Sequence, residues 1–439
     1  MIKKLALFFL ASCFIFNASI AVAYDDSEII LKLLIKKGLI TENEVTQMRQ
    51  EIAVEKAKAG AAEAPKTTEA RVAVVEKDLL SKVGLDKISS RLKLKGRAAV
   101  GYFDSDERGS FNNGSFQVPE AKMHFTFLPD DINQVIMRLN LNNAVFNSVD
   151  YLYLDTNIMK LTPWEKGPFT LSSRIGEFKA DIGEETWSNN MVEGILPSNS
   201  AANVGGYDEG LQFFGTIGRD RPLGWSFTAM NGNSGTGADT NWLKSLNVRM
   251  SYNLFDPLYV SASYYNSGNL GEQSSAISIG GISTPPAGAV KWVRQILEGD
   301  IRYDIKKGKV LNPPAYCDSL AYIKGAYGYF YDNAAPTAPG RGVLSREGTY
   351  GFVESLINIT KKFYVAGRVS AVALSGVDNT AAFNNITCNL YERYSLGMGY
   401  RLSNATILKA SYDINVEKKG AGGEDPKNNL LSAIIASQF

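Results

Sequence analysis

Apolar and polar residues alternate along most of the chain, from residue 90 to Phe439. Residues 134–142 read Gln-Val-Ile-Met-Arg-Leu-Asn-Leu-Asn, and residues 245–254 read Ser-Leu-Asn-Val-Arg-Met-Ser-Tyr-Asn-Leu. Successive side chains of a β-strand point to opposite faces of its sheet. A period of two therefore predicts strands with one apolar face and one polar face, rather than helices.

Sixteen such segments can be counted, and their length distinguishes them from the strands of soluble proteins. Many span nine to fourteen residues, whereas strands of globular proteins cluster around ~5–6 residues and a tilted membrane crossing takes ~9–11. The expected strands are residues 90–103, 114–127, 132–145, 149–160, 168–179, 209–217, 225–231, 244–254, 258–266, 292–305, 317–331, 348–359, 363–374, 389–402, 406–415 and 429–439.

The connections between these segments alternate in length. Short turns are expected at residues 128–131, 218–224, 255–257, 360–362 and 402–405, and long polar loops at 104–114, 183–208, 231–241, 266–291, 332–347, 375–389 and 416–427. Outer-membrane barrels have short turns on one side and long loops on the other, and they close because no open sheet edge can face lipid. We therefore predict an all-β transmembrane fold, an antiparallel outer-membrane β-barrel of about sixteen strands over residues 90–439. The loop at 146–148 is short for its side, which leaves fourteen or eighteen strands as alternatives.

Residues 1–89 follow a different pattern. Residues 1–23 resemble a signal peptide, with Lys3 and Lys4 before an apolar stretch and a small-residue cleavage site at 21–23, although a retained anchor is an alternative. Residues 24–89 are predicted to form a short periplasmic helical segment and linker, because apolar residues recur at helical spacing over 27–36 and residues 41–44 form a capping box. This segment either tethers or oligomerises the protein, with peptidoglycan as a possible contact, or is a solvated spacer.

Composition narrows the possible functions. The formal net charge is +1, from 46 basic and 45 acidic residues, so no nucleic-acid partner is expected. One histidine and three cysteines exclude a multi-His or Cys-rich metal site, and we expect neither a metal nor another cofactor. His124 is the single candidate histidine base, and its position in the alternation of its strand points toward the barrel interior. No Gly-x-Ser-x-Gly motif is present, so we expect the protein not to be an enzyme. Cys317 and Cys388 either pair or are unrelated small apolar residues.

The polar strand faces should enclose water, since a barrel of about sixteen strands is too wide to be filled by its own side chains. The expected channel-lining basic residues are Lys93, Lys95, Arg97, Lys122, Arg138, Arg249, Arg294, Arg302, Arg368, Arg393, Arg401 and Lys409. The acidic residues expected on the same face are Glu120, Glu298, Asp300, Asp304 and Asp413. Twelve basic positions against five acidic ones predict a positive lumen, which favours anions. The alternative is that these charges pair across strands and only stiffen the wall.

The loop at 183–208 could fold inward and constrict the lumen. It would then place acidic side chains at the narrowest point, opposing the charge of the wall. These residues are Glu184, Glu185, Glu193, Asp208 and Glu209.

Several stretches resemble the phosphate-selective porin O/P family. Residues 174–185, Arg-Ile-Gly-Glu-Phe-Lys-Ala-Asp-Ile-Gly-Glu-Glu, are similar to its segment R-x-G-Q-F-K-x-P-F-G-x-E. The sequence departs from it at Glu177, Asp181 and Ile182, and residues 207–210 lack an expected arginine. Residues 37–42, 231–233, 394–402 and 408–412 also resemble that family. The resemblance implies a sixteen-stranded outer-membrane porin, usually trimeric, with a basic, anion-selecting channel.

The sequence thus predicts a porin of the bacterial outer membrane, a water-filled channel for passive diffusion of small hydrophilic solutes that prefers phosphate or other small anions. The partners expected are outer-membrane lipid, lipopolysaccharide and two further copies in a homotrimer. The alternative is a structural or adhesive barrel that displays long surface loops.

Overall fold

A computed structural model describes residues 91–141, 148–163, 167–188, 190–219, 222–232, 243–305, 320–336, 344–376, 381–383, 386–418 and 425–439. The predicted signal peptide and helical segment, residues 1–23 and 24–89, lie outside the described residues. So does Cys317, which leaves its pairing with Cys388 a prediction. Among the described residues, no helix has the length and hydropathy needed to span a membrane.

Seventeen strands join one antiparallel sheet, and all but one of them form the barrel wall. The exception is β11 (Leu270–Gly271), a two-residue strand that pairs with β13. The sixteen wall strands are β1 (Leu92–Ser105), β2 (Ser115–Phe127), β3 (Asn133–Asn140), β4 (Ser148–Asn157), β5 (Phe169–Lys179), β7 (Tyr207–Ile217), β8 (Leu223–Met230), β9 (Ser245–Phe255), β10 (Leu258–Asn266), β13 (Ala289–Ile305), β14 (Ala321–Pro336), β15 (Leu344–Asn358), β16 (Phe363–Gly376), β19 (Leu390–Arg401), β20 (Thr406–Lys418) and β21 (Leu430–Gln438).

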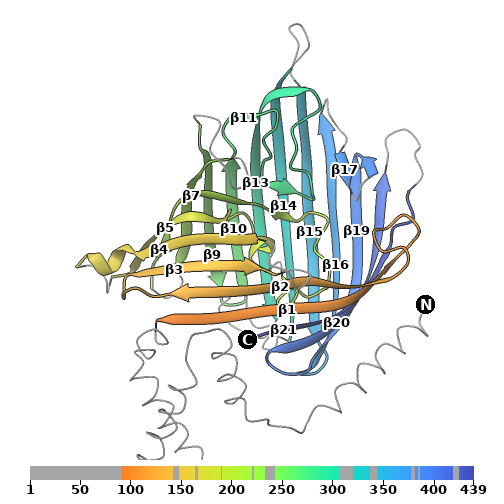
Figure 1. Ribbon diagram of the computed structural model, residues 1–439, viewed down its shortest axis with the longest axis horizontal. Coiled ribbons are helices and arrows are strands. Elements are labelled where there is room, and N and C mark those ends of the chain that lie inside the picture. The colour runs from red at the N-terminus through yellow and green to blue at the C-terminus, as the bar shows by residue number, and fades with distance from the viewer. Residues whose placement is uncertain are drawn as a thin grey trace, which may run out of the picture. The chain divides into compact units, whose positions relative to one another are not determined.

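Pairing of the first strand with the last closes the barrel (Figure 1). The register runs from Arg97 opposite Gln438 to Ser105 opposite Leu430. Beyond it, the backbones of Gly96 and Phe439 exchange hydrogen bonds of 3.0 and 2.9 Å. A β-carbon at Gly96 would overlap the Phe439 ring, so glycine lets the last aromatic side chain pack against β1.

The predicted count of sixteen wall strands is confirmed, and each predicted segment coincides with a strand of the structure. The long strands β13, β14 and β15 span 17, 16 and 15 residues and extend further than the alternation indicated. β3, with 8 residues, is shorter than expected. Short turns at 128–132, 218–222, 256–257, 359–362 and 402–405 mark one end of the barrel, called here the turn end. Two connections at the turn end, 158–168 and 306–320, are longer.

Two small pairs of strands and two short helical turns complete the described structure. The strand pairs are β6 (Val204–Gly205) with β12 (Ser278–Ile279), and β17 (Ala381–Phe383) with β18 (Ile386–Cys388). The helical turns are η2 (Ile158–Leu161) and α6 (Glu185–Ser188).

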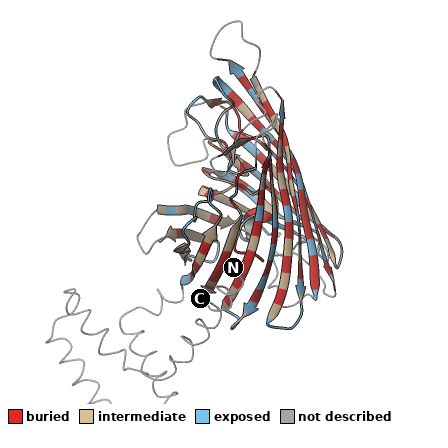
Figure 2. Cartoon of the chain, turned by 90° about the vertical axis from the view of Figure 1, so that its right-hand side faces the viewer, coloured by how far each residue is buried: buried red, intermediate tan, exposed pale blue. Residues whose placement is uncertain are grey.

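The outward side chains of the wall are apolar and exposed. On β13, buried and exposed residues alternate from Trp292 to Ile305, and the same banding is visible on the neighbouring strands (Figure 2). Leu297 and Ile301 are 59% and 53% exposed, although full burial of such a side chain is worth about 1.5–3 kcal/mol. A continuous belt of this kind is stable in hydrocarbon and is typical of outer-membrane barrels.

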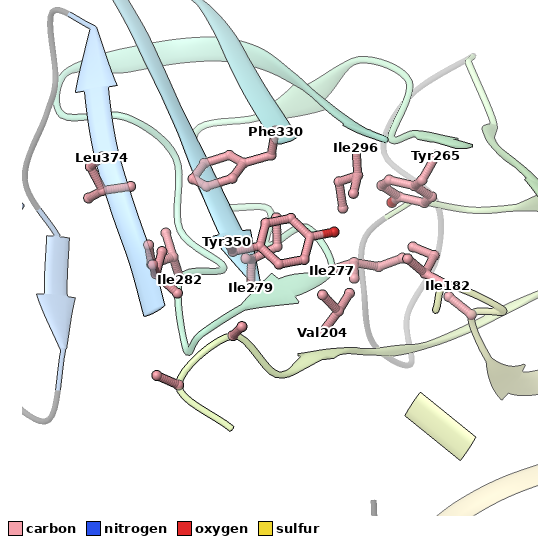
Figure 3. Close-up of a cluster of buried hydrophobic side chains, with 14 of the residues drawn as sticks. Ile182, Val204, Tyr265, Ile277, Ile279, Ile282, Ile296, Phe330, Tyr350 and Leu374 are labelled. Carbon is pink, nitrogen blue, oxygen red and sulfur yellow. The ribbon is translucent and has the colours of Figure 1, made fainter. Parts of the chain in front are cut away.

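Two loops from the opposite end, the loop end, lie against the inner wall. The first inserted loop comprises residues 180–206, and the second comprises residues 267–288. They are joined where β6 pairs with β12. Ile182, Val204, Ile277 and Ile279 pack with inward side chains of the wall in one buried cluster (Figure 3).

The inner wall under these loops is apolar, which the sequence alternation did not indicate. Phe330 and Tyr350 are 0% and 3% exposed and belong to the buried cluster shown in Figure 3. Phe330 is an inward residue of β14. Its ring faces inward, because the inserted loops turn this part of the lumen into a packed core.

Candidate channel

The first inserted loop is bonded to inner-wall residues on strands all around the barrel, which places it inside. Met191 N donates to Glu120 of β2 at 2.8 Å, Glu184 N donates to Asp300 of β13 at 3.0 Å, and Ser198 Oγ donates to Asp413 of β20 at 3.0 Å. These contacts divide the interior into a side that the loop covers and a side that it leaves open.

On the covered side, inward basic residues bind the loop instead of facing water. Arg249 pairs with Asp181 at 2.9 Å and with Glu184. The ammonium of Lys409, which is 2% exposed, donates to the carbonyls of Met191 and Val192 at 2.8 and 3.0 Å and also to that of Gly194.

Two further predicted lining residues also hold the first inserted loop. Arg368 of β16 donates to Ser198 Oγ at 3.3 Å and lies 3.8 Å from Glu185. Arg393 of β19 donates to the carbonyl of Asn199 at 2.9 Å.

The remaining predicted basic residues on this side are paired with the wall. Arg294 is fully buried, with both of its bonds to Asp332 at 2.7 Å, and it also donates to the carbonyls of Ile277 and Ile282 in the second inserted loop. Arg302 forms an ion pair with Asp304 at 3.0 Å. Arg401 donates to Asn358 at 3.0 Å at the turn end. These residues point inward as predicted, but pairing and burial make them parts of a stiff wall.

The open side follows the inner faces of β1–β5, where cavities succeed one another from end to end. A cavity of about 410 Å³ at the loop end shares Lys122, Lys179, Asn190 and Tyr207 with a middle cavity of about 180 Å³. The middle cavity shares Arg174 with a cavity of about 790 Å³ at the turn end and with a side cavity of about 220 Å³.

The middle cavity is the smallest of these four and the most basic. Five of its twelve lining residues are cations, and none carries a carboxylate. The lining consists of Arg97, Lys122, His124, Arg138, Tyr151, Tyr153, Arg174, Phe178, Lys179, Thr186, Asn190 and Tyr207. The cavities on either side contain both acidic and basic residues.

Carboxylates behind the lining neutralise part of this charge. Glu120 accepts from Arg97 at 2.6 Å, and Asp155 binds Arg174 through two bonds of 2.8 and 2.9 Å. Asp150 lies 2.7 Å from Lys122 and 2.9 Å from Arg138. Five cations against three carboxylates leave two positive charges, and Lys179 donates to a neutral acceptor, the carbonyl of Thr186.

A β-bulge explains how Asp150 reaches this position. The register between β3 and β4 shifts between Arg138 and Leu139, so that Asp150 has no cross-strand partner of its own. Extra residues at bulges re-aim side chains. Asp150 and Tyr151, although adjacent, therefore both contact groups at the middle cavity.

The sequence prediction located part of this site. Of the predicted lining residues, Arg97, Lys122 and Arg138 border the middle cavity, and His124 faces inward as its parity indicated. Lys93 and Lys95 are exposed near the turn end of β1, where Lys95 lies opposite His124. Arg174 and Lys179 were missed as lining residues, although both belong to the stretch that resembles the porin family. The run Ser-Ser-Arg-Ile-Gly-Glu did not establish which residues of β5 face inward.

The acidic constriction that the sequence allowed is not formed by the carboxylates of the first inserted loop. Glu184 binds Arg249, Glu185 accepts from Ser200 N at 3.0 Å, and Glu193 accepts from Asn190 at 2.7 Å. None of them lines the middle cavity. The loop does fold inward, but it directs these side chains to the wall or to itself.

Solved structures with the same architecture are outer-membrane proteins. The outer membrane channel DcaP of Acinetobacter baumannii matches with a TM-score of 0.53 and 12% identity, over 79% of this chain and 97% of that chain. The fold is that of an outer-membrane porin. OmpT of Vibrio cholerae (TM-score 0.49, 11% identity) covers 79% of this chain and 97% of its own, and the anion-selective porin from Comamonas acidovorans (0.47, 12%) covers 79% and 99%. No protein-family model and no curated protein sequence matches the chain. The structural neighbours support the porin fold and do not distinguish the phosphate-selective family from other porins.

Proposed function

We propose that this protein is a diffusion channel of the bacterial outer membrane that admits small hydrophilic solutes and prefers anions. The observation that carries the proposal is the middle cavity, where five cations and no carboxylate line the smallest space in the series on the open side. Low-dielectric walls focus the field in such a cleft and raise the local concentration of counter-ions. The solute path would run between the first inserted loop and the inner faces of β1–β5.

The pairing seen elsewhere in the barrel explains why the middle cavity should dominate selectivity. Arg249, Arg368 and Lys409 are bound to carboxylates or carbonyls of the first inserted loop, so their charge is compensated locally. Basic residues that line a pore favour anions. Preference for phosphate over other anions goes beyond this argument and stays a prediction from the family resemblance, as does the homotrimer. Contact with lipopolysaccharide stays a prediction for an outer-membrane barrel, and contact with peptidoglycan stays a prediction for residues 24–89.

Reversal potential in planar bilayers under a KCl gradient tests the proposal. Wild-type channels should show anion preference, and Lys122→Gln with Lys179→Gln should shift the potential toward the cation side. Lys291→Gln is the control, because Lys291 is exposed and lines none of the four cavities. Cation preference in the wild type would refute the proposal, and the absence of conductance would favour a loop-displaying structural barrel.

A further inference from the structure

We propose that the middle cavity is a binding site for small aromatic carboxylates, which it selects over aliphatic carboxylates and inorganic anions. The inference rests on the proposed function, since the cavity must lie on the solute path. It adds to that function a ligand class with a ring as well as a charge.

The cavity carries a continuous aromatic surface beside its cations. Tyr151 lies 5.4 Å from Tyr153 and 6.2 Å from Tyr207, measured between ring centroids. Phe178 is fully buried and packs edge-on against Tyr153 at 6.3 Å, which supports that ring from behind. The three tyrosines are only partly buried, so each retains surface toward the open space.

Cation–π contacts hold the guanidinium groups against these rings. Arg138 lies 4.3 Å from the centre of the Tyr151 ring and 5.5 Å from that of Tyr207, and Arg174 lies 4.2 Å from that of Tyr153. The N–H groups of a guanidinium match the plane of a carboxylate. Arg174 already binds Asp155 through two bonds, whereas Arg138 uses Nε for Asp150 and Nη2 for Tyr207. Among the described residues, Nη1 of Arg138 has no bonding partner and is left for a ligand, and the same holds for Nη1 of Arg174.

Lysine ammonium groups complete the charged part of the site. Lys122 and Lys179 border both the middle cavity and the cavity at the loop end. A carboxylate that enters from the loop end would meet them first and then Arg138. Its ring would follow along Tyr207 and Tyr151, where aromatic pairs prefer offset or edge-to-face contact.

The hydroxyls of Tyr151 and Tyr207 are already bonded, so these residues offer a ligand mainly their ring surfaces. The Tyr151 hydroxyl lies 3.1 Å from His124 Nδ1, and the Tyr207 hydroxyl accepts from Arg138. An inorganic anion would gain contacts with the cations but nothing from the aromatic surface. A ring that covers about 50 Å² of that surface gains about tenfold in affinity, at about 25 cal/mol per Å².

Block of the chloride current in planar bilayers tests the inference, with sodium benzoate, acetate and cyclohexanecarboxylate as probes. Benzoate should reduce single-channel chloride current at about one tenth of the acetate concentration, in line with the ring area above. Cyclohexanecarboxylate should fall between them, because it is apolar but not flat. The double variant Tyr151→Ser with Tyr153→Ser should lose this preference, so that benzoate and acetate block at similar concentrations. The matched variant Tyr151→Phe with Tyr153→Phe should retain the preference for benzoate.

The outcomes separate the inference from the proposed function. Equal block by benzoate and acetate in an anion-preferring channel would overturn the ligand class alone. Cation preference or the absence of conductance would overturn both. If the serine variant does not fold, block by the three acids is compared on the wild type and the phenylalanine variant. That comparison still tests the preference for aromatic carboxylates.

Discussion

Removal of the Asp332 charge tests whether the second inserted loop is held by a buried ion cluster. Asp332 Oδ1 and Oδ2 each accept a 2.7 Å bond from Arg294, and Oδ2 also accepts bonds of 3.0 and 2.8 Å from Arg346. Both guanidiniums also donate to carbonyls of the second inserted loop, those of Ile277 and Ile282 from Arg294 and that of Thr284 from Arg346. Asp332→Asn keeps the size of the side chain and leaves two buried cations without their shared carboxylate.

The structure indicates the size of the effect. Asp332 and Arg294 are 0% exposed and Arg346 is 3% exposed, so water cannot replace the lost partner without opening the packing. Loss of one partner of a buried ion pair costs about 3–5 kcal/mol. We expect Asp332→Asn to lower the free energy of unfolding by about that amount, in a urea titration of protein refolded in detergent. The same variant should also be cleaved faster by protease within residues 267–288.

A surface carboxylate on the neighbouring strand provides the control. Glu347 accepts a 2.6 Å bond from Tyr329 at an exposed site, and Glu347→Gln should change the free energy of unfolding by less than about 0.5 kcal/mol. If Asp332→Asn costs no more than this control, the cluster does not hold the loop and the argument from burial is wrong.

Three further predictions follow from contacts of the first inserted loop, the middle cavity and the turn end. Arg368→Gln should lower the free energy of unfolding by about 1–3 kcal/mol, because it loses the charged hydrogen bonds to Ser198. The reversal potential of this variant in planar bilayers should equal that of the wild type. A large shift of that potential would place Arg368 on the solute path. Tyr207→Ala removes a ring shared by the middle and loop-end cavities and should raise single-channel conductance; lower conductance would mean that the pore collapses there. Hydrogen bonds from the Asn133 side chain and from the backbone N–H groups of Asn133 and Ile132 hold the pKa of Asp130 below its usual range. This bonding therefore stabilises the folded state above the unfolded pKa of about 4, and the stabilisation is lost as the pH falls through the lower folded value. NMR titration should place the pKa of Asp130 below about 4, the value of an unfolded aspartate, and an unshifted value would contradict the turn geometry.

The strand pattern could be predicted from the sequence because lipid imposes one rule on every outward position. Leu297, Ile301 and Tyr303 are apolar for that reason, whatever lies inside the barrel. The inward positions obey no such rule. Phe330 packs against an inserted loop, Arg138 borders a cavity, and Arg294 is sealed in an ion cluster, yet all three sit on inward faces of the same wall. The environment of each inward residue depends on where the two inserted loops pack. That packing joins residues far apart in the chain, and the local alternation of apolar and polar residues does not predict it.

Local irregularities account for the rest of what the sequence did not reveal. Asp150 was missed because a bulge shifts the register of β4, and Arg174 was missed because β5 mixes small, polar and apolar residues on both faces. Pairing across strands occurs at Arg294 of β13 with Asp332 of β14, whereas Arg302 pairs with Asp304 on its own strand. Of the predicted lumen charges, Arg97, Lys122 and Arg138 border the middle cavity, where the first inserted loop leaves the wall uncovered.

The bonding of the first inserted loop also dictates an order of assembly. Its partners include Lys409 and Asp413, which follow Gly194 and Ser198 in the chain by 215 residues each. Contacts so distant along the chain form late. A nascent protein that has laid down its first strands therefore lacks several of the contacts that hold this segment until β20 arrives. The pairing of β1 with β21 and the packing of the first inserted loop would then occur as one cooperative step. A barrel that has not completed this step would leak.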